Sequence, residues 1–371
     1  MTGAGGDSTV GAGAARRVQV IGLGLVGASI ASGLRARGWH VSGIDQDEDR
    51  AERARDLGMV DRLGHDTSAE LAFVATPASA VVGVVEDLSR AYGDDLVLTD
   101  VAGVKGPIAA GIDNPRFVAG HPMAGSEQEG PEGADPELFV GATWVLTPGD
   151  RTDPSAFTLV QSVVALLGAD VVALSAERHD ELVALVSHVP HLTAATLMSL
   201  AGESPLDHAA LMRLAAGGFR DMTRIAAGSA TIWPDICRDN AGAIVPALDR
   251  LIERLSEVRG IVAGGDRSRL ERFLEGARVA RRNLPARGLR PAEVSELRVL
   301  VPDRPGVLAE VTTVAGELGA NIFDLEIAHS AEGPRGVLVL VIDAEASSAV
   351  SDALRARGYR VASAEPGGRV A

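Results

Sequence analysis

A glycine-rich stretch near the amino end constrains this chain more than any other feature. The segment VQVIGLGLVGASIASGL carries glycines in the spacing G-x-G-x-x-G, between an apolar run and an amphipathic segment. Between a strand and a helix, this spacing allows a tight turn, close approach of a pyrophosphate and close helix packing. A helix N-terminus there also offers free N–H groups to phosphates. The expected phosphate-binding residues are Gly22, Leu23, Gly24, Leu25, Val26 and Gly27.

Asp45 ends the next apolar run, about 20 residues further on, as the dinucleotide-binding fingerprint requires. A carboxylate at this position accepts hydrogen bonds from ribose hydroxyls and repels a 2′-phosphate. The sequence therefore predicts NAD, rather than NADP, as the cofactor. The alternative interpretation is a glycine turn in an unrelated α/β sheet.

Strand-like and helix-like segments alternate over residues 17–174, which we interpret as one domain. The strand-like runs are VQVIGLG, WHVSGID, LAFVAT, LVLTD, FVAG and ATWVLT. Amphipathic segments lie between them, among them Val26–Arg37 and Ala80–Ala91. This alternation predicts an α/β domain with a doubly wound, largely parallel sheet of the Rossmann type.

The pattern changes after this domain. Residues 175–284 place apolar side chains at helical spacing and predict an all-helical second domain. Residues 285–295 are rich in proline and glycine and predict a linker. In residues 296–371, strand-like runs surround two helical segments in the order βαββαβ, which predicts a small ferredoxin-like domain. The first sixteen residues are rich in glycine and alanine, and we expect a disordered tail.

Composition narrows the possible partners and the compartment. The 371 residues carry a net charge of −15, which argues against nucleic acid or an anionic membrane as the main partner. Cys237 is the only cysteine, so no internal disulfide can form and a reducing compartment is expected. No uninterrupted apolar run reaches the roughly 18 residues of a membrane span. We expect a soluble, cytoplasmic protein.

His121 follows an apolar run in the segment FVAGHPMAGSEQEG. Gly120 and Pro122 should interrupt strand pairing, which places His121 on a loop at the strand exit. Thr76, Pro77 and Asp100 end neighbouring strands, so these residues should meet His121 at the carboxyl edge of the sheet, beside the cofactor. An imidazole there suits a general base. The alternative is a strand-end histidine bound to backbone.

Two further stretches of the helical region carry polar side chains of interest. His188 and His191 lie three residues apart, but no nearby carboxylate or cysteine completes a metal site, so no metal is expected. We expect His191 to face a substrate and His188 to be structural. Arg220, Asp221 and Arg224 should share a helical turn, where a guanidinium could grip a substrate carboxylate. A surface salt bridge is the alternative.

Five motifs in order resemble those of the prephenate/arogenate dehydrogenase family of tyrosine biosynthesis. They are VIGLGLVGASIA, TDVAGVK, GHPMAGSEQEG, SHVPHLTA and GGFRDMTRIA followed by a tryptophan, within residues 17–283. The resemblance implies that His121 accepts a ring hydroxyl proton and that Arg224 binds a substrate carboxylate. It also implies a homodimer formed through the helical domain. Further substrate-binding positions implied by the resemblance are Ser126, Glu127, His191, Arg220, Asp221 and Trp233.

One position departs from the family pattern. Many members carry a serine, hydrogen-bonded to the catalytic histidine, where this chain has Gly103. We expect that a water molecule or another hydroxyl group, such as that of Ser126, orients His121 instead, or that the substrate is handled differently.

The C-terminal domain resembles an ACT domain, a common amino-acid-sensing unit. The resemblance places an effector pocket in two loops and suggests feedback inhibition by tyrosine. The alternative is a purely structural dimerisation module. The expected regulatory residues are Asp303, Pro305, Gly306, Asn321 and Ile322.

The expected activity is NAD-dependent oxidative decarboxylation of prephenate to 4-hydroxyphenylpyruvate. Arogenate and 4-amino-4-deoxyprephenate are alternative substrates. A β-hydroxyacid dehydrogenase would use a lysine of the helical domain, whereas Lys105, the only lysine of the chain, lies in the sheet domain. The alternative from another functional class is a non-catalytic regulator that senses NAD and amino acids.

Overall fold

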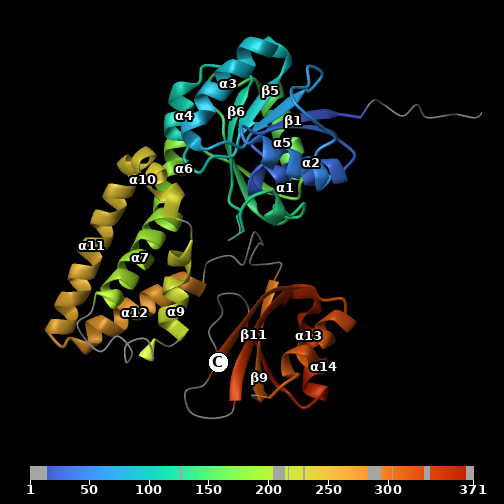
Figure 1. Ribbon diagram of the computed structural model, residues 1–371. Coiled ribbons are helices and arrows are strands. Elements are labelled where there is room, and N and C mark those ends of the chain that lie inside the picture. The colour runs from blue at the N-terminus through green and yellow to red at the C-terminus, as the bar shows by residue number, and fades with distance from the viewer. Residues whose placement is uncertain are drawn as a thin grey trace, which may run out of the picture. The chain divides into compact units, whose positions relative to one another are not determined.

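The computed structural model describes residues 15–125, 128–203, 214–215, 217–228, 230–282, 294–302, 304–329 and 335–364. The chain divides into two compact units, residues 1–252 and 253–371. The division falls inside one long helix, α11 (Ala241–Ala263) (Figure 1). Each unit is therefore described by itself.

The first unit is built on an eight-stranded sheet in the order β3-β2-β1-β4-β5-β6-β7-β8. All neighbouring strands are parallel except β6 and β7. The strand order reverses beside β1, which is where ligands bind in doubly wound sheets. The predicted sheet is confirmed. The strands are β1 (Arg17–Ile21), β2 (His40–Ile44), β3 (Arg62–Leu63), β4 (Leu71–Val74), β5 (Val97–Asp100), β6 (Phe117–Pro122), β7 (Thr143–Thr147) and β8 (Asp170–Ala173).

Helices cover both faces of this sheet because successive strand residues point to opposite sides. Val18, Val20 and Phe73 pack on one face against α1 (Leu25–Ala36), α2 (Glu48–Asp56) and α5 (Pro154–Leu166). Ile21, Ala72 and Val74 pack on the other face against α3 (Ala78–Tyr92) and α4 (Gly106–Gly111). Two apolar cores therefore fix the carboxyl ends of the strands.

The rest of the first unit is helical. Helix α6 (Ala176–Val183), a π-helical turn (Ala184–His188) and α7 (Val189–Gly202) form one continuous stretch, followed by α9 (Gly217–Thr223) and α10 (Trp233–Asp239). No strand occurs among the described residues from 176 to 282. By length and composition alone the stretch 176–202 could cross a membrane, and little of its most apolar part is buried within the structure.

The second unit contains α12 (Arg267–Arg282) and a four-stranded antiparallel sheet in the order β10-β11-β9-β12. Helices α13 (Val307–Glu317) and α14 (Ser347–Ala356) share an apolar core with this sheet. Their order in the chain is βαββαβ, as predicted. The strands are β9 (Val294–Pro302), β10 (Ile322–His329), β11 (Arg335–Asp343) and β12 (Arg360–Ala364).

Candidate active site

His121 lies within strand β6, not on a loop after it. Pairing of β6 with the parallel strand β5 stops at Val118, and antiparallel pairing with β7 continues from Ala119 to Pro122. The expectation that Gly120 and Pro122 end the strand is wrong, because β7 takes over as the hydrogen-bonding partner. The imidazole of His121 is thereby fixed on a rigid strand at the carboxyl end of β5.

Two residues of α6 extend from His121 into the helical region. Nδ1 of His121 lies 2.8 Å from Nε2 of His179, and Nδ1 of His179 lies 2.7 Å from Oδ1 of Asp180. The Asp180 carboxylate also accepts the backbone N–H groups of Lys105 and Gly106, at 2.8 and 2.7 Å. His179 is fully buried. The three side chains form a continuous hydrogen-bonded row.

This row determines which nitrogen of His121 can act as a base. A carboxylate only accepts hydrogen bonds, so Nδ1 of His179 carries the proton and its Nε2 is the acceptor in the neutral ring. Nδ1–H of His121 must then donate to His179, which leaves the lone pair of His121 on Nε2. Nε2 is the ring atom nearest to Gly103, where a Cβ atom would lie 3.7 Å away.

A buried ion pair bonds Gly120, the residue directly before His121. The Lys105 ammonium is fully buried, contacts the Asp100 carboxylate and donates to the carbonyl of Gly120 at 2.7 Å. Asp100 also accepts the backbone N–H groups of Ala102 and Gly120, at 2.9 and 3.0 Å. The sequence assigned Asp100 to cofactor binding. Its carboxylate is instead fully buried and bonded to Lys105 and to two backbone N–H groups.

The environment of His121 disfavours its charged form. Burial holds the pKa of His121 well below its usual range, and the positive charge of Lys105 lowers the pKa further, as do His179 and His188. Burial also lowers the pKa of His191. A neutral imidazole at neutral pH is the form that accepts a proton.

The sequence predicted that water or a hydroxyl such as that of Ser126 orients His121. The structure assigns that role to His179, which bonds the ring from the Nδ1 side. Ser126 and Glu127 lie outside the described residues. A Cβ atom added to Gly103 would lie at an ordinary contact distance from Nε2 of His121, so a small side chain would fit there without a clash.

The helical region supplies an aromatic pair. The rings of His191 and Trp233 stack with centroids 3.6 Å apart and planes at 14°. His188 meets Trp233 edge to face at 6.0 Å, and its Nδ1 lies 3.2 Å from Nδ2 of Asn240. The same amide group of Asn240 donates to the carbonyl of Asp180 at 3.0 Å. These contacts connect the predicted residues His191 and Trp233 to the row that ends at His121.

The predicted arginine group is divided between two elements. Arg220 and Asp221 lie on α9, which ends at Thr223, and Arg224 begins a separate 3-10 turn (Arg224–Ala227). All three side chains are exposed in the described chain. Arg224 follows Thr223 directly, so the three residues lie on one uninterrupted helical stretch whose last turn is tighter.

The glycine loop and its surroundings fit a dinucleotide. Gly22 has φ of +93°, and a Cβ atom on Gly27 would overlap the carbonyl of Gly22, so both positions require glycine. A Cβ on Gly24 would meet nothing within 4 Å, which leaves its backbone open to a phosphate.

Polar side chains beside the glycine loop also bear on cofactor binding. Asp45 accepts the Leu23 N–H at 2.7 Å. The buried hydroxyl of Thr76, beside the exposed Pro77 that caps α3, has no protein partner to bond.

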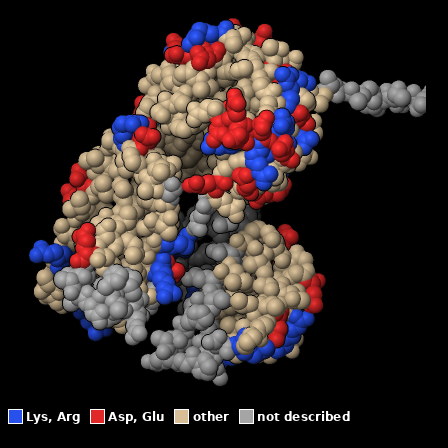
Figure 2. Space-filling model, viewed as in Figure 1, with Lys and Arg blue, Asp and Glu red and all other residues tan. Residues whose placement is uncertain are grey.

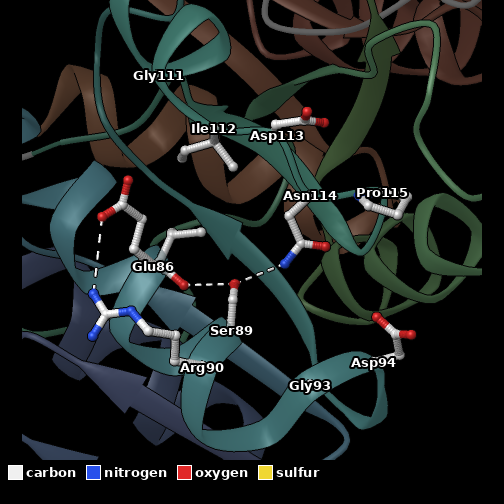
Figure 3. Close-up of a pocket in the computed structure, with 11 residues that line it drawn as sticks. Glu86, Ser89, Arg90, Gly93, Asp94, Gly111, Ile112, Asp113, Asn114 and Pro115 are labelled. Carbon is white, nitrogen blue, oxygen red and sulfur yellow. Dashed lines mark hydrogen bonds and ion pairs between the residues drawn. The ribbon is translucent and has the colours of Figure 1, made fainter.

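Figure 3 shows a cavity that is separate from the site around His121. It measures about 470 Å³ and is lined by the end of α3 and the segment 111–115. Strands β5 and β6 begin just after these two segments, whereas Asp100 and His121 lie at the carboxyl ends of the same strands. The cavity therefore lies at the opposite edge of the sheet from the site.

Models of three known domains match consecutive parts of the chain. They are the prephenate dehydrogenase nucleotide-binding domain over residues 30–173, the prephenate dehydrogenase dimerization domain over 175–276, and the ACT domain over 295–361. A prephenate dehydrogenase of Bacillus subtilis is 33% identical over 336 residues, which are 86% of this chain and 90% of the relative. The chain belongs to the prephenate dehydrogenase family.

Solved structures of similar proteins agree. Prephenate dehydrogenase of A. aeolicus in complex with hydroxyphenyl propionate and NAD+ has a TM-score of 0.68 and 28% identity, covering 73% of this chain and 98% of that one. Synechocystis arogenate dehydrogenase has a TM-score of 0.65 and 30% identity, covering 71% and 98%. The family resemblance and the ACT domain predicted from the sequence are confirmed.

Four residues of this prephenate dehydrogenase family site were missed at the sequence level: His179, Asp180, Lys105 and Asn240. The available signal was the adjacent pair His179-Asp180 at the start of a helix, directly after the sheet domain. Among the described residues, no group of three His, Cys, Asp or Glu side chains is arranged to hold a metal ion.

The predicted regulatory residues lie in the ACT domain. Gly306, with φ of +88°, precedes α13. The backbone N–H of Asn321 donates to Asp343 at 2.9 Å, and Ile322 begins β10. Pro305 is exposed, and Asp303 lies outside the described residues.

Proposed function

We propose that this enzyme oxidises and decarboxylates prephenate to 4-hydroxyphenylpyruvate with NAD. The observation that carries the proposal is the orientation of His121, whose Nε2 lone pair is set by His179 and Asp180 at the carboxyl edge of the nucleotide-binding sheet. A general base at that edge suits removal of a hydroxyl proton beside a bound dinucleotide.

The residues have few tasks because aromatisation drives the reaction. NAD, when bound by the glycine loop and Asp45, supplies the hydride acceptor. Nε2 of His121 takes the ring hydroxyl proton as hydride leaves the same carbon. The bond between the ring and its carboxyl group then breaks, carbon dioxide leaves, and the bonding electrons complete the aromatic ring. Arg224 would bind a substrate carboxylate. The further proposed substrate-binding residues are Arg220, Asp221, His191, Trp233, Ser126 and Glu127.

Arogenate is the second substrate to test, because an arogenate dehydrogenase is among the similar structures. The two compounds differ by a keto or an amino group on the side chain. Parallel kcat/KM measurements on prephenate and arogenate, each with NAD and with NADP, assign the substrate. A preference for arogenate would replace prephenate in the proposal without changing the role of His121.

We also propose that the enzyme is a homodimer in the cytoplasm. Large apolar side chains are exposed on helices α7 and α11, which the dimerization domain model covers. Figure 2 shows a broad area without Lys, Arg, Asp or Glu over the helical region. Such surface is typical of a subunit interface. Sedimentation of the full chain tests the assignment, and a monomer at micromolar concentration would contradict it.

The ACT domain supports feedback inhibition by tyrosine, the amino acid to which the proposed product leads. The effector would bind at the loops of Asp303, Pro305, Gly306, Asn321 and Ile322. Gly306→Val strains the first loop because of its positive φ. We expect the variant to lose inhibition by tyrosine and to keep its kcat. Equal inhibition of both proteins would contradict the regulatory role.

His121→Asn tests the central claim. The amide cannot accept the proton as a base, so we expect kcat to fall on the order of 10²–10⁴-fold. The affinity for NAD, followed by NADH fluorescence titration, should stay unchanged. A variant with nearly normal kcat would remove His121 from the mechanism.

A further inference from the structure

Lys105 has no counterpart elsewhere in the chain. It is the only lysine among 35 lysine and arginine residues. Its side chain is fully buried, whereas lysines are almost always at least partly exposed. Taking an ammonium group out of water is costly and requires a paired charge and hydrogen bonds. A buried position that retains the only lysine therefore needs a specific explanation.

The contacts of Lys105 reach both ends of the row that orients the base. Its ammonium group holds the Gly120 carbonyl, directly before His121, at 2.7 Å and contacts Asp100. Its backbone N–H holds Asp180, at the far end of the row, at 2.8 Å. One residue thus contacts the strand that carries the base and the carboxylate that fixes its tautomer.

We propose that Lys105 is the positioning residue of the site: it locks His121, His179 and Asp180 into one arrangement, and its buried positive charge keeps His121 an uncharged base. This inference rests on the proposed function, since it assumes that His121 accepts a proton in the reaction. It assigns the lysine to the preparation of the base, not to contact with the substrate.

The charged and titratable groups around His121 support this role. From the sheet domain, these are the Lys105 ammonium and its partner Asp100 at the end of β5, both of which bond Gly120 of β6. From the helical region they are His179, His188 and Asp180. Lys105 is the largest electrostatic contributor to the low pKa of His121 after burial, and the two histidines act in the same direction.

Lys105→Met removes the charge and keeps the length of the side chain. Because this change leaves Asp100 buried without its partner, we pair it with the double variant Asp100→Asn/Lys105→Met, which replaces the ion pair by neutral groups. Arg17→Met is the matched control. It breaks the ion pair with the nearly buried carboxylate of Asp66, at the opposite edge of the same sheet.

The first readout is the titration of His121 by histidine Cε1–H NMR in the free enzyme, assigned with His121→Asn. We expect the midpoint to rise by about one pH unit in Lys105→Met, the lower end of the effect of a neighbouring charge, and by a smaller amount in the double variant, which also loses the negative charge of Asp100. The acid limb of kcat/KM should rise with it. Arg17→Met should shift neither. An unchanged His121 midpoint in the double variant would overturn the proposal.

The second readout follows Lys105 itself. The full-length protein labelled with 15N-lysine gives a single side-chain signal, because the chain has one lysine. Burial lowers the pKa of Lys105, and the carboxylates of Asp100 and Asp180 oppose this shift. We expect the signal to remain that of an ammonium group across the neutral range, from about pH 6 to pH 8. A neutral amine in this range would overturn the electrostatic role. An enzyme inactive on prephenate and arogenate, yet with the expected NMR shifts, would contradict the proposed function alone.

Discussion

The imidazoles of His121 and His179 meet edge to face, with centroids 5.1 Å apart and planes at 74°. This geometry aims a nitrogen of each ring at the other, across the boundary between the sheet and α6. The imidazole of His121, which we propose as the base, is thus held by a residue of the helical region, although His121 belongs to the nucleotide-binding sheet.

His179→Asn should therefore impair catalysis without removing the base. Without the acceptor at Nε2 of His179, the His121 ring is free to rotate and to change tautomer. We expect kcat to fall on the order of 10²-fold, the cost of a misplaced catalytic group, with a small change in KM. His40→Asn is the matched control, because His40 also lies beside an aspartate, Asp61, at a distant edge. Equal kcat values in the His179 variant and in wild type would contradict the orienting role.

The activity should persist into mildly acidic solution. Because the pKa of His121 lies well below its usual value, the base stays neutral as pH falls through about 6.5. We expect kcat/KM on the acid side to stay level past this pH and to decline only at lower values. If kcat/KM fell to half its maximum near pH 6.5 or above, the base would not be the buried His121.

The same lowered pKa values imply a loss of stability in acid. The folded state lowers the pKa of His121, His188 and His191, so the unfolded chain binds protons first as pH falls below about 6.5. Stability should be complete above that pH and decrease below it, down to the folded-state pKa values. Urea unfolding of wild type and His121→Asn from pH 7.5 to 5 measures the effect. The variant should lose less stability than wild type, and identical slopes would contradict the assignment.

Cofactor preference should depend on Asp45 and its neighbour Arg50. Oδ1 of Asp45 lies 3.3 Å from the Arg50 guanidinium. The carboxylate therefore repels a 2′-phosphate and also pairs with the cation that could otherwise bind this phosphate. We expect Asp45→Ser to raise kcat/KM with NADP relative to NAD by about tenfold or more, equivalent to roughly 1.4 kcal/mol. Adding Arg50→Ala should cancel the gain, whereas adding Arg53→Ala, one turn away and paired with Glu132, should not. A gain that survives the loss of Arg50 would exclude its role.

Arg224→Ala should weaken substrate binding more than turnover. A guanidinium that grips a carboxylate equally in the ground state and the transition state changes KM and leaves kcat nearly constant. Steady-state kinetics on prephenate, with Arg238→Ala on α10 as the control, separate the two parameters. A large fall in kcat at unchanged KM would show that Arg224 acts in the transition state instead.

The sequence predicted the fold well because its signals are local. The glycine spacing, the alternation of strands and helices and the βαββαβ pattern each depend on neighbouring residues, and these elements are confirmed. The course of β6 was not predictable in this way. Pro122 usually ends a strand, and only the arrival of β7 on its other side keeps His121 in the sheet.

The candidate site was harder to predict because its support comes from distant segments. His121 and His179 are 58 residues apart in the chain, and Lys105 and Asp180 are 75 apart. Spacing rules cannot identify such pairs. Asp100 shows the opposite error. Its place at a strand end suggested contact with the cofactor, whereas its carboxylate is fully buried and paired with Lys105.

The burial of the single lysine also determines how this protein responds to amine-directed chemistry. Succinimidyl esters, aldehydes and similar reagents find no exposed ε-amino group on it, because every other basic side chain of the chain is an arginine or a histidine. Such reagents should therefore leave the residues around His121 unmodified.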